Sequence, residues 1–161
     1  MKASSILFLL LMATMSLGQT VAKPNAQLLD TAIDQYLKEM NRHFGITPTQ
    51  FIIETTDKTN YQAIKKKVGN TAIVVKTKKE LQDYSRQKVG EAIGFFVIDV
   101  EKTGDKYTVD IMDDGIQCTL QDGNPNFSYD SVGIGRACIL TFDGNFVFEH
   151  IDCLLLPSDP K

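Results

Sequence analysis

The chain has 161 residues, of which 43% are hydrophobic and 23% charged, and its formal net charge is −3. This balance excludes an intrinsically disordered chain and is typical of a folded globular protein. About 140 residues after a leader segment make one domain of ordinary size, which can bury a core without a cofactor or a metal, and we predict neither.

The N-terminal segment MKASSILFLLLMATMSLG has the pattern of a secretory signal peptide. One lysine is followed by an apolar run from Ile6 to Met12 and then by small and weakly polar residues. The run is shorter than the roughly 20 apolar residues of a membrane span. We therefore predict a signal peptide over residues 1–22, cleaved after residue 18 or 22, and a secreted or periplasmic protein without a transmembrane segment. Residues 23–161 then form a single α+β domain.

The first half of this domain alternates between helices and strands. Apolar residues recur every three or four positions over 26–44, which predicts a helix capped by Asn25 and ended by Gly45. The elements predicted after it are a strand near 50–55, a two-turn helix between Asn60 and Gly69, a buried strand over 71–76 and a helix over 78–89. The last helix begins with Thr77 and Glu80 at capping-box spacing.

In the second half the apolar period changes to two. A hairpin around Thr103-Gly104 leads into one long strand over 106–121, bent at a glycine bulge in 113–115, and then into a loop over 122–135. Strands 136–142 and 145–155 follow, joined by a two-residue turn at Asp143-Gly144. The predicted fold class is α+β, with an N-terminal helix and two shorter helices packed on a curved antiparallel sheet. Its C-terminal part is a meander of about four long strands.

The register of the last hairpin decides which cysteines can pair. A two-residue turn places Cys138 opposite Glu149 and puts Cys153 roughly 13 Å away at about 3.3 Å per residue. A disulfide needs Cα atoms within about 7 Å. The sequence therefore predicts a bridge between Cys118 and Cys138, with Cys153 as a buried small hydrophobe.

A Cys-His-Asp hydrolase is the sharpest catalytic alternative. On a strand His150 and Asp152 share one face while Cys153 points to the other, so Cys118 would have to serve as the nucleophile. No zinc motif such as HxH, HExxH or CxxC occurs, and the Asp/Gly/Asn clusters at 113–115 and 122–124 are typical of turns. We therefore predict no catalytic and no metal-binding residue.

Charge is distributed unevenly along the chain. Residues 58–88 carry nine Lys or Arg against two acids, whereas residues 99–161 carry twelve acids against four bases. A Lys-rich face containing Lys65, Lys66 and Lys67 can meet an acidic partner, although a merely solvated face is the alternative. Nucleic acid is not expected as a partner, because an exported protein is separated from the nucleic acid of the cell and because no aromatic platform lies beside the lysines.

Phe127 and Tyr129 form a second candidate binding group within the predicted loop over 122–135. The alternative is that this loop covers the sheet with its own aromatic side chains. The sequence thus favours a small exported, non-catalytic protein that binds a protein or small ligand through its curved sheet and this loop, or through its Lys-rich face. The other candidates are a hydrolase with a cysteine or carboxylates in the sheet cavity, and an envelope-associated structural protein.

Overall fold

The computed structural model describes residues 19–21, 25–129 and 136–155. It is an α+β structure in which helices pack on a curled sheet, as predicted. Its elements are β1 (Gln19–Val21), α2 (Ala26–Phe44), β2 (Gln50–Glu54), the 3₁₀ helix η1 (Lys58–Tyr61), β3 (Lys67–Val68), β4 (Thr71–Lys76), α3 (Lys78–Arg86), β5 (Ala92–Thr103), β6 (Lys106–Gln121), β7 (Asn124–Tyr129), β8 (Arg136–Phe142) and β9 (Phe148–Leu155). Apart from β1, the predicted signal peptide lies outside the described residues.

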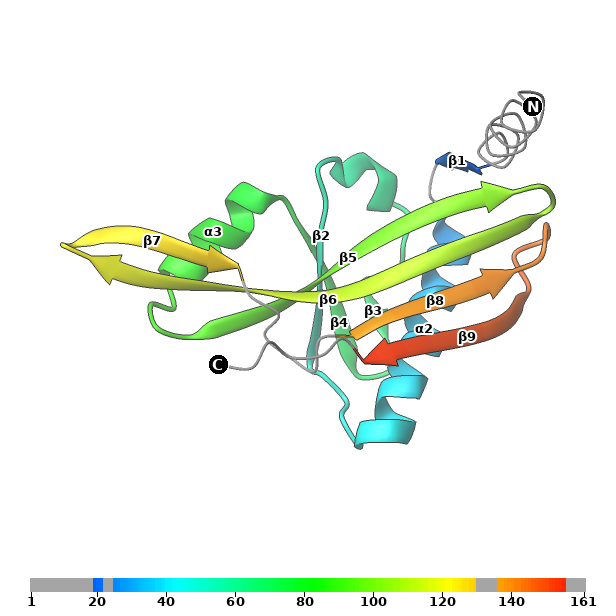
Figure 1. Ribbon diagram of the computed structural model, residues 1–161, viewed down its shortest axis with the longest axis horizontal. Helices are drawn as coiled ribbons and strands as arrows, with labels where there is room; N and C mark the ends of the chain where they lie inside the picture. The colour runs from blue at the N-terminus through cyan, green and yellow to red at the C-terminus, as the bar shows by residue number, and fades with distance from the viewer. Residues whose placement is uncertain (1–18, 22–24, 130–135, 156–161) are drawn as a thin grey trace, which may run out of the picture.

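One mixed sheet contains all of these strands. Its main order is β3-β4-β2-β5-β6-β8-β9, and β1 pairs with β5 while β7 pairs with β6. Strand β2 runs parallel to β4 and β5, and the succession β5-β6-β8-β9 is antiparallel. The long strands β5 and β6 run the length of the molecule, with α3 and β7 at one end and α2, β8 and β9 at the other (Figure 1).

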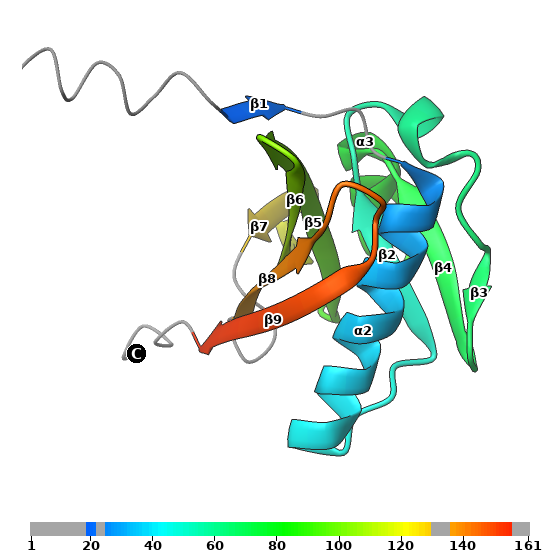
Figure 2. The ribbon, with the colours of Figure 1, turned by 90° about the vertical axis from the view of Figure 1, so that its right-hand side faces the viewer.

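Helix α2 begins and ends as its sequence predicts. The Asn25 side chain accepts hydrogen bonds from two first-turn amides, and Gly45 takes a left-handed conformation with φ 62° that closes the last turn. The helix buries its apolar stripe, centred on Ile33 and Tyr36, in the first hydrophobic core. Figure 2 shows α2 inside the curl of the sheet, with β9 on one side of it and β3 and β4 on the other.

A second, smaller core lies on the opposite face of the sheet under α3. Ile93 and Phe95 of β5 belong to it, whereas Ile98 and Val100 of the same strand belong to the first core. Because side chains alternate along a strand, this change from odd to even positions means that the strand is covered on one face by α3 and on the other by α2. The two halves of the long hairpin therefore bury opposite faces.

The predicted glycine bulge is wrong for this reason. Strands β5 and β6 pair residue for residue, with Gly94 directly opposite Gly115 and no shift in register between them. The apolar pattern of β6 changes parity near Gly115 because the covering helix changes. A change in which face of the strand is buried and a bulge residue inserted into the strand both move its apolar residues from odd to even positions. The sequence pattern alone therefore does not distinguish the two.

The predicted helix between Asn60 and Gly69 is also wrong. The structure has only the short η1 there, and Tyr61 and Ile64 are buried by contact with the first core. Main-chain groups that a helix would use bond elsewhere: the amide of Lys65 donates to Asp30 at 2.8 Å, and the carbonyl of Lys66 accepts from Ile73 at 2.9 Å. Tertiary contacts thus replace the local helical ones.

The last hairpin has a longer turn than predicted. The Asp143 carboxylate accepts hydrogen bonds from the amides of Asn145 and Val147 at 2.9 and 2.8 Å, and Phe146 packs on Tyr107 with ring centroids 5.0 Å apart. These contacts hold a turn over 143–147 and set Phe142 opposite Phe148. The predicted two-residue turn is therefore wrong, and so is every cross-strand pair derived from it.

The new register joins Cys138 to Cys153. The two residues lie directly opposite each other with Cα atoms 4.1 Å apart, and they form a disulfide. The predicted bridge between Cys118 and Cys138 is wrong, because Cys138 lies opposite Ile111, roughly 23 Å along β6 from Cys118 at about 3.3 Å per residue. The two side chains also belong to opposite faces of the sheet, and Cys118 is a buried free thiol.

Candidate functional site

The residues of the thiol hydrolase alternative are far apart. His150 lies in the cross-strand row of Thr108, roughly 33 Å along β6 from Cys118 at about 3.3 Å per residue. His150 and Asp152 share one face of β9, as predicted, with Nε2 3.0 Å from a carboxylate oxygen. Cys153 is bonded to Cys138. The described residues therefore bring no free cysteine to this histidine.

Phe127 and Tyr129 belong to β7 and not to a loop, which corrects the prediction for residues 124–129; residues 130–135 lie outside the described residues. Both aromatic side chains contact α3. Arg86 lies over the ring of Phe127 at 5.2 Å, and Lys78 lies over the ring of Tyr129 at 4.8 Å. Gln82 also donates a hydrogen bond to the Tyr129 hydroxyl at 3.0 Å. Both side chains therefore contact α3 from a strand of the sheet, and they do not belong to a loop that covers the sheet.

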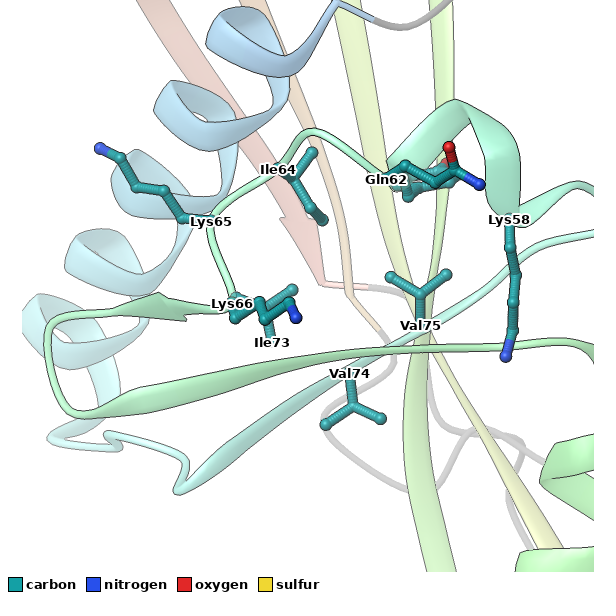
Figure 3. Close-up of a pocket in the computed structure, with 9 residues that line it drawn as sticks. Lys58, Gln62, Ile64, Lys65, Lys66, Ile73, Val74 and Val75 are labelled. Carbon is teal, nitrogen blue, oxygen red and sulfur yellow. The ribbon is translucent and has the colours of Figure 1, made fainter.

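The lysines at 65–67 border two hollows. The larger one, which we call the Lys66 cleft, has a volume of about 450 Å³ and lies between β4 and the segment over 58–66. In Figure 3 Val75 points into the cleft from β4, Lys58 and Lys66 stand at its two ends, and Lys65 points away from its centre. Its lining is Lys58, Tyr61, Gln62, Ile64, Lys65, Lys66, Ile73, Val74 and Val75.

The ammonium groups around the cleft differ in their partners. Lys58 forms an ion pair with Glu80 at 2.5 Å. Among the described residues, Lys66 has neither a carboxylate partner nor an aromatic ring beneath it. The cleft therefore combines an apolar floor with the exposed, unpaired ammonium group of Lys66 at one end.

Tyr61 forms part of the cleft floor and is held in its neutral form. Its side chain is buried, and its hydroxyl donates a 3.4 Å hydrogen bond to the carbonyl of Ile98. Burial, together with the nearby Asp99 carboxylate, raises the pKa of Tyr61 to about 12. At neutral pH this phenol is a hydrogen-bonding group and not a base.

Comparisons with protein-family models, curated proteins and solved structures found no match.

The second hollow beside these lysines balances its own charge. It has a volume of about 290 Å³ and is lined by Lys65 and Lys67 together with Asp30 and Asp34 of α2. Because both signs of charge are present, this hollow has less attraction for an anion than the Lys66 cleft.

In the described part of the chain, no helix has an apolar stretch long enough to cross a membrane.

A group of carboxylates that the sequence did not predict lies on the opposite face of the sheet from α2. Asp99 and Asp110 lie directly opposite each other on β5 and β6, and Glu101 lies two residues beyond Asp99. Burial raises the pKa of Asp110, and the neighbouring Glu101 and Asp99 carboxylates raise it further. The carboxylates of Asp99 and Asp110 become neighbours only through the pairing of β5 with β6, so the spacing of acidic residues within one segment does not reveal the group.

Replacing Asp110 with asparagine is expected to increase the free energy of unfolding at pH 7 by about 0.5 kcal/mol, because it removes a like-charged cross-strand pair. The folded state holds the Asp110 proton more tightly than the unfolded state does, so wild-type stability falls as the pH rises through the raised pKa. The advantage of the variant should therefore grow from about pH 3 to pH 7. Urea titrations followed by circular dichroism would measure it, and an advantage that stays constant with pH would contradict the assignment.

Proposed function

We propose that the protein is an exported, non-catalytic binding protein whose Lys66 cleft takes a small anionic ligand with an apolar portion. The observation that carries this proposal is the uncompensated ammonium group of Lys66 beside the apolar floor formed by Ile64, Ile73 and Val75. A carboxylate or phosphate would contact the ammonium group, and the apolar portion would displace water from the floor.

The dimensions and chemistry of the cleft support this ligand class. Its volume of about 450 Å³ lies within the range of about 300–1,000 Å³ that is common for small-molecule sites. The lining supplies ammonium groups, the Gln62 amide and a neutral phenol, which are groups that bind and orient. Since β7 already uses Phe127 and Tyr129 against α3, the Lys-rich face is the better supported of the two predicted binding surfaces.

Export is part of the proposal and has two supports. The first eighteen residues have the charge and hydropathy pattern of a signal peptide. The disulfide between Cys138 and Cys153 suits an oxidising compartment. An envelope-associated structural role would instead show itself as stable self-association in size-exclusion chromatography.

Titration calorimetry with decanoate tests the cleft. We expect saturable binding that Lys66→Glu weakens about tenfold or more, a loss of about 1.4 kcal/mol. Decyltrimethylammonium has a chain of the same length with a positive head group, and we expect it not to bind.

Lys79→Glu is the matched control, since Lys79 is an exposed lysine of α3 outside the cleft lining. It makes the same change in net charge, and decanoate affinity should stay within about twofold of wild type. Equal losses in the two variants would show that the total charge, and not the cleft, attracts the anion. Equal affinity in Lys66→Glu and wild type would refute the proposed site.

A further inference from the structure

Among the described residues, no helix packs on the face of the sheet that carries Asp99 and Asp110 at the end where α2 lies behind it. We call it the outer face; β5, β6, β8 and β9 all contribute to it. The register aligns Val97, Met112, Ala137 and Leu154 in one row across these four strands. Figure 1 looks onto these strands with α2 behind them.

This row is apolar and is most exposed at its β9 end. Val97 packs against the second core, Met112 is 37% exposed and Leu154 is 62% exposed. The row therefore extends the second core onto the surface. In the next row on the same face, Ile139 adds a further apolar side chain that is 41% exposed.

Carboxylates border this apolar row. Asp99 and Asp110 lie in the row beside it, and Glu54 lies at its end, directly opposite Val97 on β2. Among the described residues, none of the three forms an ion pair with a lysine or arginine. Lys76, the cross-strand neighbour of Glu54, instead has its ammonium group over the ring of Tyr84 at 4.9 Å.

A hollow is present where the acidic residues meet the apolar row. It has a volume of about 200 Å³, and its lining includes Glu54, Val97 and Asp99. Two carboxylates and an apolar wall suit the side chain of a lysine or arginine, which combines an aliphatic stem with a positive head group. The hollow thus places the Glu54 carboxylate and an apolar wall beside the Asp99 carboxylate, a combination that suits a cationic occupant.

We propose that the outer face binds a basic amphipathic helix of a partner protein, with one basic side chain inserted between Glu54 and Asp99. Three strand spacings of about 4.8 Å make the apolar row about 14 Å long, which is the length of about ten helical residues. The acidic row lies about 7 Å to one side, within reach of lysine or arginine side chains on the flank of such a helix. Tyr61 lines both this hollow and the Lys66 cleft, but the proposal for the outer face does not depend on the function proposed for the cleft.

A synthetic peptide of about 14 residues, with leucines along one helical stripe and lysines on one flank, is a suitable probe. Fluorescence anisotropy should show saturable binding to the full mature protein. The double variant Asp99→Asn, Asp110→Asn should weaken this binding about tenfold or more. Loss of folding would not explain that result, because removing the like charges is expected to stabilise the sheet.

The control variant Asp105→Asn, Asp122→Asn removes the same charge from two exposed turn residues away from the outer face. It should bind the peptide within about twofold of wild type. Amide shift changes in ¹⁵N spectra should map to β5, β6, β8 and β9, and Lys66→Glu should leave them unaltered.

Three results would overturn the proposal. The first is the absence of saturable binding of the peptide, and the second is equal binding of a peptide with glutamates in place of the lysines. The third is a stable dimer of the mature protein that dissociates on Leu154→Asp, which would make a second copy of the chain the occupant of this face.

Discussion

Replacing Phe51 with alanine is expected to lower the free energy of unfolding by about 4 kcal/mol. The Phe51 ring is completely buried at the centre of the first core, where it stacks on Phe96 with centroids 4.0 Å apart and meets the edge of Tyr36 at 5.8 Å. Alanine would leave a cavity between α2 and β2 that these rigid rings cannot close. Because the chain has no tryptophan, urea unfolding should be followed by far-ultraviolet circular dichroism.

Phe44→Ala supplies the matched control. It makes the same chemical change at the end of α2, where the side chain is 37% exposed, and we expect a loss of about 1 kcal/mol or less. Similar losses at both positions would contradict the packing of α2 against β2. A larger loss at Phe51, with an unchanged dependence of stability on urea concentration, would support it.

Reducing the disulfide between Cys138 and Cys153 is expected to lower the free energy of unfolding by about 3 kcal/mol. The bridge spans 15 residues of sequence, and closing a loop of this size removes about that much entropy from the unfolded chain. Reduction should be efficient without denaturant because Cys153 is exposed. Urea titrations with and without dithiothreitol measure the difference.

Cysteine variants distinguish this pairing from the one that the sequence predicts. Cys153→Ala should lose the dependence of stability on dithiothreitol, whereas Cys118→Ala should keep it. A thiol assay should find no reactive group in the native protein and one in the denatured protein, because Cys118 is buried and free. If the dependence of stability on dithiothreitol were lost in Cys118→Ala and kept in Cys153→Ala, β8 and β9 would have to pair in another register.

Elements with local signals could be predicted closely. Helix α2 has its apolar stripe and both ends within one segment, and α3 begins with the Thr77–Glu80 capping box that the structure contains. The long strand β6 matches its predicted bounds. Strand β7 was missed because residues 124–129 have few strand-forming residues, and their pairing with β6 and packing under α3 come from distant parts of the chain.

The candidate binding surfaces likewise combine features that local sequence predicts with features that depend on contacts between distant segments. Lys66 was predicted as part of a Lys-rich face from local charge alone, but the apolar floor beside it depends on β4 lying under the 58–66 segment. The outer face needs four strands in a defined register before its apolar row and its carboxylates become neighbours. Neither juxtaposition is visible along a single segment.

The amino-acid sequence by itself determined the α+β class, the two α-helices with their starting residues and most of the strands, because these follow from periodicity and capping over a few neighbouring residues. Only the tertiary structure decided which face of each strand is buried, how long the last turn is and which cysteines pair. A shift in the pairing of β8 with β9 changes little in local propensity, yet it changes every cross-strand partner. The register is selected by the packing of Phe146 and Phe148 against the first core, which lies between α2 and the sheet, together with the Asp143 hydrogen bonds that hold the turn.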